Sequence, residues 1–572
     1  MNKRAWILSI LIGASLSSFG QSRLRKLPTI INHPAINVSA PYISLDGNSL
    51  IYVSDNADEN ALTMFHTVKK DAVNWKEPVM LPRTVNSRLN FLKGSALSSN
   101  GQQLYISSLK GGGLGGFDIL VSELRGKVWS EPINIGLPIN SSGHEACPSL
   151  TADGNMIYFM RCEKMDQNSA DGCKLFFSKK SRTGKWEEPV ELPSFINTGN
   201  SQTPRIMGDG ETLLFASNKL PQNKGKMDLY VTRYINATWS EPVPLTFCNT
   251  AGDDQYVSAS SQGRYLLKDQ PGQRKTEIVE LLFPPELKPK ASMKIEGLVT
   301  GISDPSSVYV AVFNQADQSR VYNGRPEKDG SFSLYVSEGN IYDLSVEPAQ
   351  DTFTFYSRVF DLTGDRIPFV ETIEAPIEPI SQSTEIDLSG IAFEPFSPKL
   401  SKFSAQELRR LVRLIKGNTD HRFQIEVTLN DYQSDSVRSS ADLSELTIDT
   451  LHFEVERQVL DTVRMDSLLA AVNKADSLSN SADSTNANAT SIIEIPSLRQ
   501  DSLEAFYKTV LVDSISIKKT YHNDRTEAQA DSIVKHLIDE GVPNQVLTVK
   551  CRRKEGGLAE ERKISVTLKV LE

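Results

Sequence analysis

The chain has 572 residues, of which 39% are hydrophobic and 23% charged, with a net charge of −9 at pH 7. This is the composition of a globular protein, and the length predicts several domains, because one domain usually holds about 100–200 residues. The mildly negative charge and the lack of a long basic run argue against a nucleic-acid-binding protein.

The first 20 residues have the layout of an export signal. Lys3 and Arg4 precede an apolar run over residues 5–14, and small and polar residues follow up to Gly20. This order is typical of a secretory signal peptide. The apolar run is too short to cross a bilayer, which takes about 20 residues. The sequence therefore predicts a signal peptide over 1–20 and a periplasmic mature protein with no transmembrane span.

Residues 21–286 contain a repeated unit. Each copy begins with a polar turn and a short apolar run, and four copies end in Trp-x-Glu-Pro. The turns begin at Asp46, Asn100, Asp153, Asp209 and, more weakly, Gln262, and the Trp motifs at Trp75, Trp129, Trp186 and Trp239. Asp-Gly and Asn-Gly suit tight hairpin turns, and the apolar runs suit strands. A period of roughly 40–55 residues indicates propeller blades, each a four-stranded sheet.

The turn markers predict about five blades, and six remain possible if the N-terminal segment hides another. Residues 27–32 read like the segment after each Trp motif, such as 137–140. The N-terminus is therefore expected to supply the outer strand of the last blade and so close the ring. Over about 36–283 these repeats resemble the TolB-like (WD40-like) β-propeller family.

Five cysteines are present. Cys162 and Cys173 flank a polar insertion in the third repeat, and in an oxidising compartment they could close it as a disulfide. The odd count leaves at least one thiol unpaired. No cysteine pair has metal-ligand spacing and the seven histidines are scattered, so the sequence predicts no metal site and no cofactor.

A proline-rich segment over 284–289 marks a domain boundary. Alternating strands are then expected, with Asp329-Gly330 as a hairpin turn; they fall at 294–299, 308–313, 331–336 and 342–346. Over 291–362 the pattern resembles the carboxypeptidase regulatory-like β-sandwich, which implies a spacer or docking module. Residues 363–385 are predicted to be a linker.

Residues 386–572 predict an α/β domain in two halves. The first half has a strand at 391–393, a helix after Ser404 with a capping box to Glu407, and a strand at 423–429. The second half has a helix at 528–537 and strands at 546–549 and 561–566. The order resembles the OmpA-like peptidoglycan-binding domain. An insertion at about 436–515 separates the halves, with a short helix near 460–469 and a disordered loop over 475–491.

The resemblance carries a ligand site with it. In that family an Asp after the second strand binds the amine of a peptidoglycan diamino acid, and an Arg in the next helix binds its carboxylate. These positions hold Asn430, followed by Asp431, and Gln529, with Arg525 one helical turn earlier. Gln cannot form the bidentate charged pair, so Arg525 is the candidate for a shifted ligand. The alternative is a degenerate domain kept for protein contacts.

The whole chain is expected to be a multidomain, mainly β protein. Its order of parts resembles the PorE-type periplasmic proteins of Bacteroidetes type IX secretion systems. This implies a scaffold associated with the outer membrane or cell wall, whose propeller binds cell-envelope proteins and whose C-terminal domain binds peptidoglycan.

Catalysis is not expected from the sequence. No acid/base residues cluster and no Gly-x-Ser-x-Gly elbow occurs, so the sequence predicts a protein that is not an enzyme. The alternative is a propeller-based hydrolase, either a peptidase or a glycosidase, and the latter needs two facing carboxylates. Asp118 and Asp228 recur at equivalent repeat positions, which favours a structural role for both.

Overall fold

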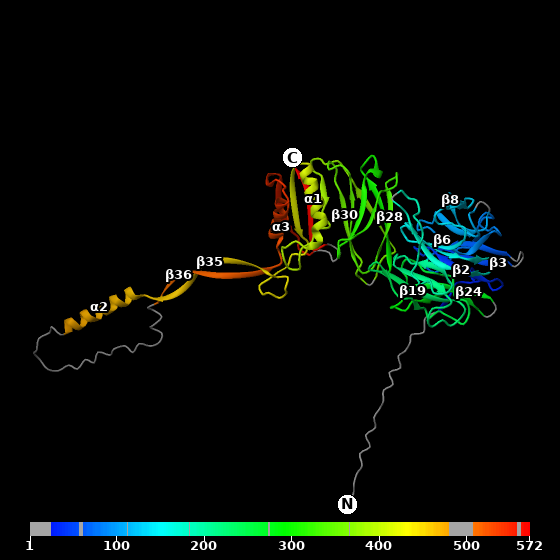
Figure 1. Cartoon of the computed structure of the whole chain (residues 1–572). Coiled ribbons are helices and arrows are strands. Elements are labelled where there is room, and N and C mark those ends of the chain that lie inside the picture. Colours follow the sequence, from blue (N-terminus) through cyan, green and yellow to red (C-terminus); the bar gives the residue numbers. More distant parts are fainter. Residues whose placement is uncertain are drawn as a thin grey trace, which may run out of the picture. The chain divides into compact units, whose positions relative to one another are not determined.

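The computed structural model describes residues 24–56, 61–110, 113–181, 183–272, 275–364, 366–479, 507–556 and 562–571. The chain forms two compact units, Met1–Ser381 and Gln382–Glu572 (Figure 1). It is built mainly of strands, as the sequence predicts. The predicted signal peptide lies outside the described residues.

The first unit begins with five propeller blades, each a sheet of four antiparallel strands. Blade 1 is β2 (Val38–Ile43), β3 (Ser49–Asn56), β4 (Ala61–Val68) and β5 (Val79–Met80). Blade 2 is β6 (Asn90–Leu97), β7 (Gln103–Ser108), β8 (Asp118–Arg125) and β10 (Ile133–Asn134), with β9 (Val128–Trp129) beside β8. The first strands of neighbouring blades contact one another and surround the ring axis.

The remaining blades follow the same plan. Blade 3 is β11 (His144–Leu150), β12 (Met156–Cys162), β15 (Lys174–Lys179) and β16 (Val190–Glu191), with the hairpin β13 (Lys164–Met165) and β14 (Ala170–Asp171). Blade 4 is β17 (Ser201–Ile206), β18 (Thr212–Ser217), β19 (Asp228–Ile235) and β21 (Val243–Pro244), with β20 (Thr238–Trp239). Blade 5 is β22 (Val257–Ser258), β23 (Tyr265–Pro271), β24 (Thr276–Leu282) and β1 (Leu24–Lys26).

The N-terminus closes the ring, which confirms the prediction of five blades and of the closing strand. Strand β1 pairs antiparallel with β24, from Leu24 opposite Leu281 to Lys26 opposite Val279. Asn32 then bonds both backbone groups of Ile278, each at 2.8 Å. A side-chain amide can do this because it offers one donor and one acceptor group.

An asparagine that bonds the third strand through its side-chain amide, here called the asparagine clamp, recurs in every blade. It explains the similarity between residues 27–32 and the segments after the Trp motifs. In each case the amide bonds the N–H and C=O of one residue in the third strand of its blade. The other pairs are Asn86 with Met64, Asn140 with Ile119, Asn197 with Leu175 and Asn249 with Leu229. The clamp ties each outer loop to its sheet.

The innermost strands carry bulges. The register with the second strand shifts between Ser39 and Tyr42 in blade 1 and at the same place in blades 2, 3 and 4. The bulged positions Ala40, Cys147 and Thr203 have φ near +50°. Positive φ is uncommon for residues with a Cβ, and bulges re-aim the side chains next to them. The bulges therefore re-aim the side chains next to them on the innermost strands, such as Gln202 beside Thr203.

A β-sandwich follows the propeller in the same unit. One sheet has the order β28 (Ser331–Ser337), β25 (Ser292–Thr300), β31 (Val370–Pro376). The other has the order β27 (Arg320–Gly324), β26 (Tyr309–Asn314), β29 (Ile341–Glu347), β30 (Tyr356–Asp361), and a short turn η1 (Pro305–Ser307) precedes β26. Strand β31 lies in the segment expected to be a linker; it pairs parallel with β25 and buries Ile373 and Ala375 in the core.

The second unit holds a four-stranded mixed sheet with the order β32 (Glu385–Asp387), β38 (Ile564–Leu571), β33 (Arg422–Leu429), β37 (Leu547–Arg553). Strand β33 runs parallel to β37 and antiparallel to β38, so the two halves of the predicted domain meet in one sheet. The helices are α1 (Ala405–Gly417) and α3 (Thr526–Asp539), with short turns η2 (Lys402–Ser404) and η5 (Asn544–Val546). Both helices bury apolar side chains such as Leu411 and Ile533.

Two local predictions in this unit were wrong. Residues 391–393 do not form a strand, and the edge of the sheet is β32 instead. Ser404 makes no side-chain cap for α1, because its hydroxyl is used by Ala392, donating to the carbonyl at 2.8 Å and accepting from the N–H at 2.9 Å.

The insertion contains a long β-ribbon that the sequence did not predict. Strands β35 (Glu445–Leu460) and β36 (Tyr507–His522) pair over their full length, and β34 (Ser434–Asp435) pairs with the base of β36 (Figure 1). Helix α2 (Thr462–Ser479) follows β35, where a shorter helix was predicted. The predicted loop is wrong over 475–479, and its remainder, 480–491, lies outside the described residues. None of the described helices is long and apolar enough to cross a membrane.

Candidate functional site

A cavity of about 380 Å³ opens at the axis of the propeller, and side chains from all five blades line it. Blades 1 and 2 contribute Leu62, Phe91 and Lys93, and blades 3 and 4 contribute, among others, Ala170 and Gln202. Blade 5 and its entry loop contribute four of the polar residues that line it, Asp253, Gln255, Tyr256 and Asp269. The wall is more polar than that of most small-molecule pockets.

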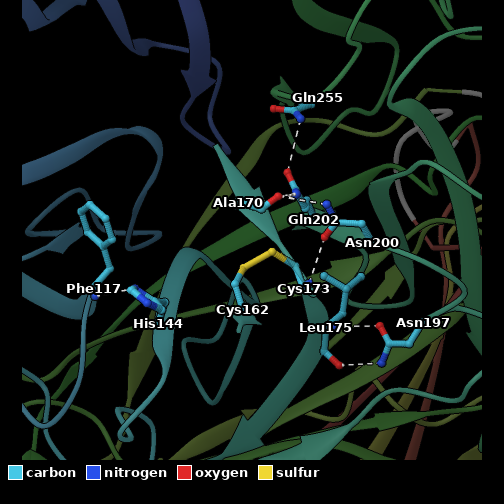
Figure 2. The surroundings of a disulfide bond; sticks show 10 residues. All are labelled: Phe117, His144, Cys162, Ala170, Cys173, Leu175, Asn197, Asn200, Gln202 and Gln255. Carbon is cyan, nitrogen blue, oxygen red and sulfur yellow. Dashed lines mark hydrogen bonds between the residues drawn. A yellow bond between two sulfur atoms is a disulfide. The ribbon is translucent and has the colours of Figure 1, made fainter. Parts of the chain in front are cut away.

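Side-chain amides form a linked row along one wall. Gln255 donates to Gln202 Oε1 at 3.3 Å, and Gln202 in turn donates to the Ala170 carbonyl at 2.8 Å (Figure 2). Asn200 donates to the same carbonyl at 3.0 Å and accepts from the Cys173 N–H at 2.9 Å. These bonds fix the orientation of the amides, so their remaining donors and acceptors point in set directions.

Cys162 and Cys173, which the sequence allows to pair, form a disulfide, and it supports this wall (Figure 2). It closes the insertion of blade 3, which carries the β13–β14 hairpin and Ala170. The carbonyl of Ala170 is the acceptor shared by Gln202 and Asn200. The disulfide therefore holds the loop that orients two pocket amides.

The opposite wall is charged. Asp269 accepts a hydrogen bond from the Ala40 N–H at 3.1 Å. Burial raises the pKa of the Asp269 carboxyl above its ordinary value, although that hydrogen bond and the charges of Lys93 and Lys268 oppose the rise. Burial also raises the pKa of Tyr256 well above its ordinary value, with Cys147, Asp269 and Asp253 adding to the effect. The Lys93 ammonium lies 5.8 Å from the centre of the Tyr256 ring.

Arg205 holds the inner strands together. Its buried guanidinium donates to the carbonyls of Ser95 at 3.1 Å and Val257 at 3.2 Å. It also lies 4.7 Å from the centre of the Tyr42 ring. One side chain of blade 4 thus contacts blades 1, 2 and 5, which fixes the spacing of the strands that carry the pocket residues.

The sequence reasoning missed Asp253 and Asp269, although one signal was present. In the first four repeats the fifth and sixth residues after the turn glycine are apolar or small, for example Tyr52 and Val53 after Gly47. In the fifth repeat the same positions hold Lys268 and Asp269. Two charges at positions that are otherwise buried in a strand mark the blade in which the repeat departs from its structural pattern.

Asp118 and Asp228, the acidic residues that the sequence did single out, lie elsewhere. Each begins the third strand of its blade and is almost completely buried. Asp118 accepts from the Leu114 N–H at 3.1 Å and the Asn134 amide at 2.9 Å. Asp228 accepts from the backbone of Lys224 and Gly225. Both carboxylates fasten the loop that precedes their strand.

Three of the four candidate residues of the C-terminal unit, Asn430, Asp431 and Arg525, form polar contacts with other protein groups. Asn430 donates to the Arg562 carbonyl at 2.8 Å and Ser565 Oγ at 2.7 Å, and Gln529 is buried in α3. Asp431 accepts from the Gln433 amide at 2.8 Å. Arg525 forms an ion pair with Asp442 of the insertion.

Further groups complete the surroundings of Asp442. Lys563 forms a second ion pair with it, and the Asn523 amide donates to it at 3.3 Å. Arg525 also lies 3.4 Å from the Glu445 carboxylate. Arg525, the residue expected to bind the carboxylate of a ligand, is thus paired with carboxylates of the insertion.

Among the residues that the structure describes, no group of three His, Cys, Asp or Glu side chains is placed to hold a metal ion.

No protein-family model and no curated protein matches the chain. Among solved structures, it is similar to a candidate TolB from Agrobacterium tumefaciens at 12% identity, over 53% of this chain and 90% of that one, with a TM-score of 0.28. It is also similar to an endo-arabinase from Bacteroides thetaiotaomicron at 16% identity, over 46% and 97% of the two chains, with a TM-score of 0.32. A third similar structure is the catalytic domain of the GH62 α-L-arabinofuranosidase of Coprinopsis cinerea. It is 11% identical over 46% of this chain and 97% of that one, with a TM-score of 0.30.

The prediction that the chain is not an enzyme is contradicted by these comparisons. Several of the similar structures are described as enzymes, including the endo-arabinase, the arabinofuranosidase and an oligogalacturonate lyase from Vibrio parahaemolyticus. The prediction relied on the lack of clustered acidic residues in the sequence. In the folded chain, however, Asp253 and Asp269 of blade 5 line the same cavity.

Proposed function

We propose that the propeller binds a glycan in its axial pocket. The observation that carries this proposal is the set of oriented amides and carboxylates on a cavity of about 380 Å³. Sugar hydroxyls both donate and accept hydrogen bonds, so they match amide groups whose directions are already fixed. Gln202 and Gln255 supply such amides, and their mutual bond means that little side-chain freedom is lost when a ligand binds.

The charged wall suits the same class of ligand. Tyr256 presents an aromatic ring beside the Lys93 ammonium, which offers an apolar face and a charged donor next to each other. Asp269 and Asp253 accept hydrogen bonds from hydroxyls. A pocket with both acceptor and donor groups favours a polyhydroxylated ligand over an apolar one.

Hydrolysis of the bound glycan is the second candidate function, and the acidic pair favours it. A glycosidase needs one carboxylic acid to protonate the leaving oxygen and one carboxylate to activate water or attack the sugar. The raised pKa of Asp269 suits the acid, because it keeps the proton available at higher pH. Asp253 is exposed at the pocket and is the candidate for the second role.

The test uses the full-length mature chain with a panel of oligosaccharides. Binding is followed by calorimetry and hydrolysis by the release of reducing ends. Gln202→Ala is expected to weaken binding about tenfold, since a hydrogen bond is worth about 0.5–1.5 kcal/mol. Asp71→Asn, at an exposed turn of blade 1, is the matched control and should leave binding unchanged. If no glycan binds, or Gln202→Ala binds as well as the unchanged chain, the proposal fails.

The two functions are separated by a further pair of variants. Asp269→Asn and Asp253→Asn keep the shape of the side chain, so they should retain glycan binding and abolish any turnover. Binding with no turnover by the unchanged chain would leave the propeller as a binding module and remove the hydrolase.

We also infer that the chain is exported and acts in the cell envelope, at the outer membrane or cell wall. Two features support this inference. The first is the leader over 1–20, and the second is the C-terminal unit, whose order of strands and helices resembles the OmpA-like domain. In that compartment the glycan strands of peptidoglycan are a candidate ligand, and envelope proteins, including those of type IX secretion, are candidate partners. Cell fractionation checks the location; recovery of the protein in the cytoplasm would contradict it.

Wall binding through the C-terminal unit is tested separately with isolated sacculi. If Asn430, Asp431, Arg525 and Gln529 bind a wall peptide, the unchanged chain should sediment with the sacculi. The Arg525→Ala variant should stay in the supernatant. Asp442→Asn should strengthen retention, because it removes a carboxylate that pairs with Arg525. Equal retention of all three chains would exclude this site.

A further inference from the structure

The β35–β36 ribbon is an incomplete sheet. Its two strands pair at sixteen successive positions, from Glu445 opposite His522 to Leu460 opposite Tyr507. The outer edge of β36 is covered only at Tyr521 and His522, by β34. Within the described part of the chain, the outer edge of β35 pairs with no strand over its whole length. A long unpaired edge presents a row of free backbone donors and acceptors.

Both faces of the ribbon also expose apolar side chains. Leu451, Phe453 and Val455 lie on one face, with 54%, 47% and 41% of their surface exposed. Ile448 and Ile515 lie on the other, with 55% and 60% exposed. A two-stranded ribbon is at best marginally stable alone in water, and three or more strands are usually needed. The ribbon therefore requires additional strands.

We propose that a second copy of this chain supplies them, by antiparallel pairing of β35 with β35 of the partner subunit about a two-fold axis at Phe453. In this register residues whose numbers add to 906 face each other. Phe453 lies opposite the partner's Phe453 and Leu451 opposite the partner's Val455, and Leu446 and Leu460 meet at the two ends. Aromatic and branched cross-strand pairs of this kind stabilise sheets.

The charges select the same register. Arg457 faces the partner's Asp449 and Glu454 faces the partner's His452, and the two-fold axis produces each pair twice. No two like charges face each other between residues 446 and 460. A two-fold axis one residue later places Glu454 against the partner's Glu454, and an axis one residue earlier loses both of these pairs. Like charges directly opposite destabilise a sheet.

The edge of β36 is less suitable. Strand β34 covers its base, which shortens the free part of the edge. Lys518 and Lys519 follow each other along it. Lysines on an edge strand are a common means of preventing pairing. Pairing through β35 therefore yields one sheet with four long strands and a short β34 at each outer edge. The result is a closed two-fold dimer with no free β35 edge to continue a fibre.

The first test measures the dimer by sedimentation velocity on the full mature chain over a range of concentrations. Arg457→Asp and Asp449→Arg are each expected to raise the dimer dissociation constant at least about tenfold, because each places two like-charged pairs across the interface. The double variant restores opposite charges and should recover the dimer. Lys519→Asp on β36 is the matched control and should have no effect.

The second test reads the register directly. Residues that face each other in an antiparallel pair have Cα atoms about 4.5–5.5 Å apart, which is within disulfide range. In a Cys551→Ser background, Phe453→Cys should form an intersubunit disulfide under mild oxidation. Ser514→Cys, which pairs with residue 453 inside one ribbon, should not. A chain that stays monomeric at all concentrations, equal cross-linking of both variants, or a double charge variant that fails to recover would overturn the proposal.

Discussion

Lys268 and Asp254 form an ion pair inside blade 5 in which both side chains are almost completely buried, at 2% and 3% exposed. Lys268 also donates to the Cys248 carbonyl at 2.9 Å, and Asp254 accepts from the Thr250 N–H at 2.5 Å. The pair joins β23 to the loop that carries Asp253, so it fixes the two segments of the charged wall relative to each other.

Removal of one partner of this pair should destabilise the propeller strongly. Lys268→Met leaves the Asp254 charge buried without a counterion, which typically costs about 3–5 kcal/mol. Urea denaturation followed by tryptophan fluorescence measures the loss. The double variant Lys268→Met with Asp254→Leu should recover much of the stability, because no charge then remains buried. A double variant no more stable than Lys268→Met would show that the pair is not the cause.

The disulfide should contribute to both stability and ligand binding. Its cysteines are 11 residues apart in the sequence. A loop of this size is expected to stabilise the folded state by about 3 kcal/mol through the lost freedom of the unfolded chain. The Cys162→Ser, Cys173→Ser variant should therefore unfold at lower urea. It should also bind glycan more weakly, because Ala170 no longer fixes Gln202 and Asn200.

Asp269 should make the propeller less stable as the pH rises. Burial raises the pKa of this carboxyl in the folded state, so the folded chain binds more protons than the unfolded chain above the ordinary value of 3.8. Stability then falls as the pH rises through the folded pKa, and the loss persists at neutral pH. Asp269→Asn should raise the melting temperature at pH 7 and reduce this fall. Its amide oxygen can still accept from the Ala40 N–H.

Asp442 should show the opposite pH dependence in the C-terminal unit. Burial opposes its ionisation, but the hydrogen bonds from Lys563 and Asn523, the charge of Lys563 and the bond from Arg525 outweigh burial and lower the pKa of Asp442 below 3.8. Its stabilising effect is complete above 3.8 and is lost as the pH falls through the folded pKa. Asp442→Asn should flatten the acid limb of the stability profile. Hydrogen exchange of α3 amides between pH 3 and 6, corrected for intrinsic rates, measures this loss of stability. If the loss at low pH is the same in Asp442→Asn, Asp442 is not its cause.

Much of the propeller could be predicted because its signals are local and repeated. The turn glycines adopt positive φ, as at Gly47 and Gly154, and the similarity of the Asn32 segment to later segments identified the closing blade. Each signal depends on the chemistry of a few neighbouring residues, so a single sequence reveals it.

The parts that were missed depend on distant partners. Strand β31 gains its place from parallel pairing with β25, about 75 residues earlier, and its own sequence reads as a linker. The β35 and β36 sequences alternate between apolar and polar residues only over short stretches, such as 451–456 and 514–518. Elsewhere they mix the two kinds on both faces, so the sequence does not reveal strands of this length. Asp253 and Asp269 line one cavity because the pairing of β22 with β23 within blade 5 brings their segments together.

The closing strand has a consequence for how this protein is made. Arg25 of β1 and its ion-pair partner Glu280 of β24 are 255 residues apart, so the ribosome must complete nearly the whole propeller before the first described strand finds its place. Until then the ring stays open and the β24 edge is unprotected. Such non-local contacts make folding slow, so the propeller stays incompletely folded until its last strands have been made.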